Sequence, residues 1–406
     1  MAKDPENICG FWPSFMTPER MVELVKVFDV QWDRRGKFLV IFEKREGQSR
    51  LLRVDPSSGF ARDLLSTNPV AVRVNYGGGE YTVGKETVYF VSRGRLNAKP
   101  LADGMVQILT RGKMQPAAPA LSPDERWVAF VYDEKETEDG IAVAAANGST
   151  PKPQKLMTGY DFFMQPVWSA DGRYLAAVAW NHPAMPWDAP VLLLAELDYA
   201  VDHPEKAPKL MHLHVIAGPD TGMIFQPEFS PNGRFLAYVA EVDNWTQLFV
   251  KDLQNGITRQ LTHHAAELAM PAWRQGVRTI GWHPDSAHLY YIVNEEGRMS
   301  VWKVAVDDPH PKCLTTGLPF DVYRQIAVDP QGTRLAMRAV ATNQPERIIV
   351  LEDNEEKSWH VVRYTTSNEI APALYSRARP VHWGEEGDLR YGLYYAPAHP
   401  QYTASG

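Results

Sequence analysis

The sequence predicts an all-β fold, a seven-bladed β-propeller with four strands in each blade. The first observation is a repeated turn of the Ser-Pro-Asp-Gly type between two apolar runs, with clear copies that start at Pro119, Pro166 and Pro227. The second is the period of this unit, about 40 to 60 residues, which is typical of propeller blades and not of helical solenoids. The third is the spread of 31 Pro and 28 Gly along the chain, as expected for many turns.

Each repeat has the chemistry of a tight β-hairpin followed by two further strands. Pro presets φ at the first turn position, Asp or Asn tolerates the next, and Gly takes the left-handed position. A run of five to seven β-favouring residues follows, which completes the hairpin. In the fifth repeat, residues 246–253 then predict a third, alternating strand, and residues 258–262 predict a fourth, outer strand.

Seven such repeats cover most of the chain. We place the blades at 27–66, 70–111, 115–158, 162–217, 224–263, 274–316 and 320–364. In the second repeat, the segment 76–81 (YGGGEY) replaces the first strand and its turn, and its small residues predict a close approach of strands near the propeller axis. The fourth repeat carries two insertions, at 180–190 and 198–209.

The two ends of the chain differ from the repeats. Residues 1–26 form a lead-in, in which Thr17, Pro18 and Glu19 predict the start of a short helix that runs to about Val25. Residues 365–406 read as a linker and a first hairpin, with strands at 380–383 and 390–396. Because an isolated hairpin is at best marginally stable, we expect residues from about 375 onward to be poorly ordered or held by another molecule.

Several segments resemble one family of serine peptidases. The repeated turn resembles the propeller repeat of TolB-like proteins and of the prolyl-oligopeptidase family. Residues 76–83 and 181–188 resemble segments of its acylaminoacyl-peptidase and dipeptidyl-aminopeptidase-like branch, and Arg379–Trp383 with 392–397 resemble the strands that lead into its α/β-hydrolase domain. The resemblance implies a propeller that caps a domain with a Ser-Asp-His triad and restricts entry to small peptides.

The chain lacks the nucleophile motif of that family. No Gly-x-Ser-x-Gly occurs, so the strand-to-helix elbow that exposes a reactive serine is absent and no catalytic residue can be assigned. We therefore expect a non-catalytic domain that gates and orients small peptides for an α/β-hydrolase domain outside this sequence. The alternatives are a standalone TolB-like propeller that acts as a protein-interaction scaffold, which would have no use for the 380–396 hairpin, and a propeller lyase with a metal in its axial channel.

Candidate substrate-binding residues lie on loops at one end of the predicted propeller, where function usually resides. They are acids, aromatics and polar residues of the fourth and fifth repeats, namely Asn181, His182, Trp187, Asp188, Glu241, Asp243 and Trp245. The resemblance implies that an acid at this end could hold a peptide's free ammonium group. Solvated loop charges with a tryptophan packed on a neighbour are the alternative reading, which the sequence leaves open.

Composition and spacing exclude several other classes. The net charge of −7 disfavours a nucleic-acid partner. No apolar run is long enough to span a membrane, and residues 1–16 lack the apolar core of a signal peptide. Two distant cysteines, Cys9 and Cys313, favour reduced thiols in a cytoplasmic protein. Homo-oligomerisation stays open.

We expect neither a cofactor nor a metal. The pairs His212/His214 and His263/His264 have no carboxylate at metal-ligand spacing. The segment 79–85 is similar to a phosphate-binding loop, but Glu86 stands where Ser or Thr should meet Mg²⁺, and no helix follows to hold a phosphate.

Overall fold

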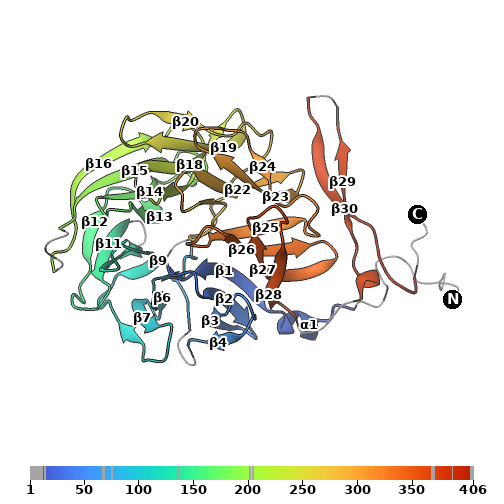
Figure 1. The fold of residues 1–406 in the computed structure, drawn as a ribbon, viewed down its shortest axis with the longest axis horizontal. Helices are drawn as coiled ribbons and strands as arrows, with labels where there is room; N and C mark the ends of the chain where they lie inside the picture. Colours follow the sequence, from blue (N-terminus) through green and yellow to red (C-terminus); the bar gives the residue numbers. More distant parts are fainter. Residues whose placement is uncertain are drawn as a thin grey trace.

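A computed structural model confirms the seven-bladed propeller (Figure 1). It describes residues 12, 15–65, 69–74, 76–134, 138–200, 203, 205–366, 371–385 and 387–402. Seven antiparallel sheets of four strands are arranged around an axis, and an eighth sheet has two strands. Within each blade, strands follow one another in sequence order from the axis outward, so every blade is a simple meander.

The strands of the first four blades have the following bounds. They are β1 (Lys26–Trp32), β2 (Leu39–Arg45), β3 (Gln48–Val54) and β4 (Ala61–Asp63); β5 (Tyr81–Val83), β6 (Thr87–Ser92), β7 (Arg95–Pro100) and β8 (Gln107–Ile108); β9 (Gln115–Leu121), β10 (Trp127–Asp133), β11 (Asp139–Ala145) and β12 (Gln154–Met157); β13 (Phe162–Trp168), β14 (Tyr174–Trp180), β15 (Val191–Asp198) and β16 (Lys209–Ala217). The two insertions of blade four therefore lie where the sequence placed them, before β15 and before β16.

The last three blades and the remaining elements complete the chain. They are β17 (Ile224–Phe229), β18 (Phe235–Val242), β19 (Trp245–Asp252) and β20 (Thr258–Gln260); β21 (Ile280–Trp282), β22 (His288–Glu295), β23 (Arg298–Ala305) and β24 (Lys312–Cys313); β25 (Val322–Val328), β26 (Arg334–Ala341), β27 (Gln344–Glu352) and β28 (Trp359–Tyr364); helix α1 (Pro18–Glu23), the 3-10 turn η1 (Pro372–Leu374), and the hairpin β29 (Ala378–Trp383) and β30 (Arg390–Tyr395).

The repeated turn is built the same way in successive blades. In blade four, the Ser169 hydroxyl donates to Asp171 at 2.7 Å and accepts the Tyr174 amide at 2.9 Å. Equivalent bonds join Ser122, Asp124 and Trp127, and Ser230, Asn232 and Phe235. These bonds satisfy the turn's polar groups as the second strand begins, which explains why the repeat needs Ser and Asp or Asn at this spacing. Neighbouring blades touch through these turns, so all of them lie at one end of the propeller.

The ring closes without a strand shared between its first and last blades, because β1–β4 form one sheet and β25–β28 form another. Apolar side chains of blade one, including Val30, Trp32 and Ile41, pack in one buried cluster with blade-seven side chains such as Ile348 and Val350. Polar contacts cross the same seam. The Arg363 guanidinium pairs with the buried Glu43 carboxylate at 2.7 Å, and the Trp32 indole donates to the Ala327 carbonyl at 3.0 Å. Side-chain packing therefore joins the first blade to the last.

The structure corrects two expectations and leaves a third untested. Helix α1 ends at Glu23 rather than near Val25, because Leu24 adopts an extended conformation. The first strand of blade two is Tyr81–Val83, and the preceding segment 76–80 crosses the axis instead of replacing that strand. The hairpin β29–β30 contacts blade six of the same chain, and the expectation that another molecule holds it stays a prediction.

Among the described residues, no helix is long and apolar enough to cross a membrane.

Cys313 is a free, half-buried thiol, whereas Cys9 lies outside the described residues. The expectation that both cysteines are reduced thiols therefore stays a prediction.

Candidate functional site

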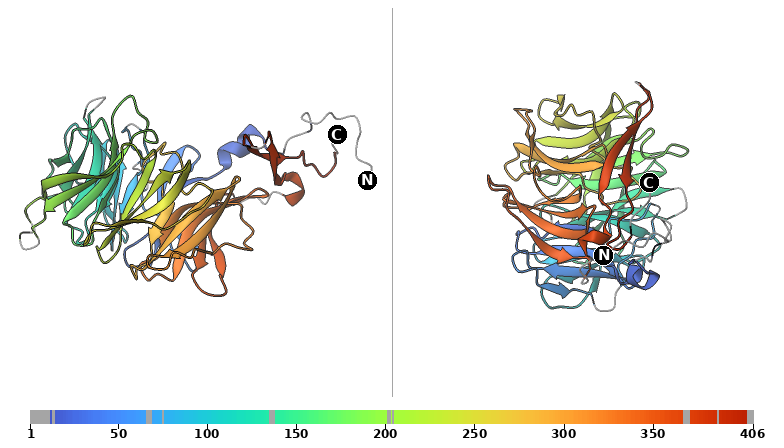
Figure 2. Two further views of the ribbon diagram at one scale, coloured as in Figure 1. Left: turned by 90° about the horizontal axis from the view of Figure 1, so that it is seen from above. Right: turned by 90° about the vertical axis from the view of Figure 1, so that its right-hand side faces the viewer.

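One end of the propeller carries the linkers between blades and the turns between second and third strands. We call it the linker face and define it by residues 181–188, 241–245, 273–275 and 296–297. The hairpin is attached here, since the His382 imidazole lies 3.2 Å from the Glu296 carboxylate and Leu393 packs on Gly297. Figure 2 shows the hairpin and α1 standing clear of the propeller body.

The blade-four loop on this face is fixed by its own hydrogen bonds. The Asn181 side-chain oxygen accepts the Asp161 amide at 2.9 Å, and the His182 amide donates to the Asp161 carboxylate at 2.8 Å. Further along, the Asp188 carboxylate accepts the Met185 amide at 2.8 Å. Asn181, His182 and Asp188 are exposed, so each stabilises the loop and still reaches solvent.

An aromatic pair extends from this loop. The half-buried Trp187 packs edge-on against Trp273, with ring centroids 4.6 Å apart. Trp273 belongs to the linker between blades five and six and is 61% exposed. Edge-to-face contact is a favoured geometry for aromatic rings. The pair therefore forms a fixed apolar ledge on the linker face, and sequence reasoning had identified only one of its two members.

The blade-five candidates occupy a tight turn. Asp243 and Asn244 both have positive φ, 51° and 66°, as a two-residue hairpin turn requires. Glu241 is half-buried and accepts the Met223 amide at 3.4 Å, which places its carboxylate against the linker before blade five. Asp243 and Trp245 are exposed, Trp245 to 38%.

The linker between blades four and five lies between the two groups of candidates. At one end, Gly218 lies against the Pro190 carbonyl, and at the other, Gly222 lies against Glu241. The structure thus places both groups on one face, on neighbouring blades.

The axis of the propeller is closed by two loops that meet across it. Gly78 and Gln275 form a parallel bridge, and the Gln275 amide donates to the Gly77 carbonyl at 2.8 Å. The same glycine segment is also joined to the neighbouring blade three, where the Ala118 amide donates to the Gly79 carbonyl at 2.9 Å. The predicted close approach at the three glycines is therefore confirmed, because a Cβ on Gly78 would lie 2.4 Å from the Gln275 carbonyl oxygen.

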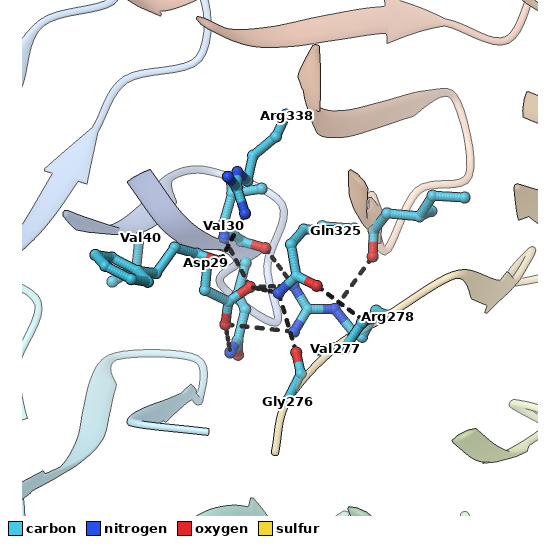
Figure 3. A network of polar contacts seen from close by, with 12 residues as sticks. Asp29, Val30, Val40, Gly276, Val277, Arg278, Gln325 and Arg338 are labelled. Carbon is cyan, nitrogen blue, oxygen red and sulfur yellow. Dashed lines mark hydrogen bonds and ion pairs between the residues drawn. The ribbon is translucent and has the colours of Figure 1, made fainter. Parts of the chain in front are cut away.

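Beside this bridge, a polar network joins blades six, seven and one (Figure 3). Arg278 and Gln325 converge on the Asp29 carboxylate, at 2.5 Å and 2.8 Å respectively. Gln325 also donates to the Gly276 carbonyl at 3.0 Å. Although burial opposes its charge, the ion pair with Asp29 raises the pKa of Arg278. This network, like Gln275, was not identified from the sequence.

The closed axis separates two cavities. A cavity of about 510 Å³ is lined by the inner strands and opens toward the repeated turns, with Gln165, Gln226 and Glu228 among its lining residues. Burial raises the pKa of Glu228. A second cavity of about 220 Å³ lies at the start of β1 and of β25, on the linker face. Within the described part of the chain, no three His, Cys, Asp or Glu side chains gather as metal ligands.

One further acid on the linker side has an unusual environment. Asp139 is 4% exposed, and its Oδ1 has no hydrogen-bond partner among the described residues. Burial, with the Asp133 charge nearby, raises the pKa of Asp139 from 3.8 to about 7. The sequence analysis did not identify Asp139 as a candidate site residue.

Comparison with known proteins shows which structures share this propeller fold. No family model matches the chain. A puromycin-hydrolysing peptidase of Mycobacterium tuberculosis has a similar structure, with a TM-score of 0.85 and 19% identity over all of this chain and 63% of that protein. A prolyl endopeptidase structure matches with a TM-score of 0.63 and 13% identity, over 89% of this chain and 53% of that one.

A sequence relative points the same way. Dipeptidyl-peptidase 5 of Porphyromonas gingivalis is 25% identical over 170 residues, which are 41% of this chain and 22% of that protein. The chain therefore spans less than two thirds of the length of the proteins it matches. Its fold is that of the N-terminal propeller of puromycin-hydrolysing and prolyl-oligopeptidase-family peptidases.

Proposed function

We propose that this chain gates and orients short peptides for an α/β-hydrolase domain that covers the linker face. The observation that carries the proposal is the hairpin β29–β30. Its side chains Trp383, Tyr391 and Tyr395 are each more than half exposed. An isolated two-stranded hairpin is marginal in water, and clustered exposed apolar side chains mark a surface that another domain or protein covers. The similar peptidase structures, which this chain covers only to about 60%, support an additional domain there.

The closed axis supports the gating role. The Gly78–Gln275 bridge and the Arg278–Asp29 pair obstruct the axis, and in this proposal they keep peptides from reaching the linker face through the propeller. Substrates then enter from the side, between the propeller and the covering domain. A chamber with only lateral entrances admits short, flexible peptides and excludes folded chains.

In this proposal, the loops of the linker face orient the peptide substrate. The Trp187–Trp273 ledge offers a rigid apolar contact. The carboxylates of Glu241 and Asp243 offer partners for a peptide's ammonium group, since charge-assisted hydrogen bonds are the strong ones. In this proposal the serine of the covering domain attacks the substrate carbonyl and the scissile C–N bond breaks, so that the C-terminal part of the peptide leaves as a protonated amine. Water then hydrolyses the acyl-enzyme, which regenerates the serine and releases a dipeptide or an N-acylated residue.

Kinetics of the polypeptide that contains both domains test this role. Trp187→Ala and Glu241→Gln should each lower kcat/KM for short chromogenic peptides more than tenfold, about 1.4 kcal/mol in transition-state free energy. The matched controls are Phe60→Ala and Glu86→Gln, exposed residues of blades one and two that lie away from the linker face. Unchanged kinetics in both test variants, with the fold intact, would return these residues to a purely structural role.

A further inference from the structure

The smaller cavity on the linker face is unusually basic. Five cationic side chains line its 220 Å³, namely Lys26, Arg274, Arg278, Arg324 and Arg338, together with the apolar Phe28 and Met270. Such a concentration of one charge beside apolar walls strengthens the local field, because low-dielectric walls focus it.

Three of these cations have carboxylate partners. Arg274 lies 3.3 Å from Glu80, Arg278 lies 2.5 Å from Asp29, and Arg338 lies 2.6 Å from Glu346. Five cations against three carboxylates leave an excess of two positive charges. These belong to Lys26, which is exposed, and to Arg324, which is half-buried.

Arg324 is the exception among the arginines. Its guanidinium makes no hydrogen bond or ion pair with any residue that the structure describes, and its Nε is shielded from solvent without a partner. In the β25–β26 ladder it stands directly opposite Arg338, and like charges at such positions are destabilising. Burial and the neighbouring Arg338 charge lower the pKa of Arg324, although the Glu346 charge opposes them. An unpaired, partly desolvated donor costs stability. Residues that are destabilising in this way are expected at functional or strained sites.

We propose that Arg324 is the anchor of a carboxylate-binding site in this cavity. The planar guanidinium fork matches a carboxylate with two parallel hydrogen bonds. A bound carboxylate that accepts from the two terminal guanidinium nitrogens would also offset the repulsion from Arg338.

The source of the carboxylate follows from the shape of the cavity, and this step rests on the proposed function. Behind the cavity, the axis is closed by the network of Asp29, Arg278 and Gln325. A peptide that enters from the linker face ends here and cannot continue through the propeller. The site therefore takes the C-terminal carboxylate of a short peptide, which sets an upper limit on substrate length.

Binding measured on this chain alone tests the site. The probes are triglycine, triglycinamide and glycyl-aspartyl-glycinamide, titrated by calorimetry at low salt. We expect triglycine to bind at least tenfold more tightly than triglycinamide, and acetate to compete with it. Equal affinity for acid and amide, or no binding of triglycine, would overturn the proposal. If glycyl-aspartyl-glycinamide binds as tightly as triglycine, the assignment to the peptide C-terminus is wrong.

Variants assign the effect to one residue. Arg324→Gln should abolish the preference for the acid, and Arg324→Lys should weaken it, since Lys lacks the planar fork. The control is Arg35→Gln, an exposed arginine paired with Glu86 away from the linker face. A full acid preference in Arg324→Gln would refute the assignment.

Folding of the variant does not limit the test, because acetate competition on the unmodified chain needs no substitution. Since no hydrolase domain takes part, this result is independent of the kinetic test of the proposed function.

Discussion

Closure of the axis makes a quantitative prediction at Gly78. This residue has φ +80°, and a Cβ there would lie 2.4 Å from the Gln275 carbonyl oxygen and 2.9 Å from the Arg274 Nε. A left-handed conformation costs a non-glycine residue about 1–2 kcal/mol. Forcing an extra carbon into a packed site costs about 1–3 kcal/mol more. Gly78→Ala should therefore lower the free energy of unfolding by about 2–5 kcal/mol.

The neighbouring glycine provides the matched control. Gly77 also has a positive φ, +54°, but a Cβ there would meet nothing within 4 Å. Gly77→Ala should consequently cost only the conformational part, about 1–2 kcal/mol. Urea unfolding, followed by tryptophan fluorescence, measures both. Equal losses in the two variants would refute the reasoning, because they would show that Gly78 does not meet Gln275 across the axis.

Three further changes test the ion pair at the closing seam, the buried Asp139 and the contribution of the hairpin to stability. Glu43→Gln should destabilise the protein by about 3 kcal/mol, because it leaves Arg363 unpaired at the closing seam, whereas the exposed Glu46→Gln should change stability by less than about 0.5 kcal/mol in the same urea assay. Since burial raises the pKa of Asp139 from 3.8 to about 7, the stability that depends on its proton is lost as pH rises through that window. Asp139→Asn should thus raise the urea midpoint at pH 8 and leave it unchanged near pH 4, and an equal effect at both pH values would contradict this. Deletion of residues 375–406 should leave the melting temperature within a few degrees, and loss of folding would show instead that the hairpin belongs to the propeller core.

The blades could be predicted because their signals are local. Ser169 and Asp171 bond to each other and to the Tyr174 amide within one turn, so the Ser-x-Asp spacing alone indicates the hairpin. The same holds for the loop 180–190, whose three prolines separate two clear strands. Blade two was partly misread, because its first strand is only three residues long and follows the glycine segment directly.

The closed axis and the basic cavity could not be predicted, because both depend on residues far apart in the sequence. Gly78 meets Gln275 only once blades two and six face each other across the ring. The unpaired state of Arg324 depends on the register of β25 against β26, which includes a bulge, and on Glu346 pairing with Arg338 instead. Trp273 lies in a linker without a repeat signal, so the sequence alone did not suggest a partner for Trp187.

Labelling with a fluorophosphonate probe tests the central claim most directly. The isolated 406-residue chain and the native polypeptide, captured from its source cells with an antibody against the propeller, are treated side by side and assayed with dipeptidyl and acyl-aminoacyl chromogenic substrates. We expect no labelling and no hydrolysis for the isolated chain, since it has no Gly-x-Ser-x-Gly motif. We expect stoichiometric labelling of one serine outside the propeller, together with hydrolysis, for the native protein. A labelled serine within the chain, or an unlabelled and inactive native protein, would contradict the account.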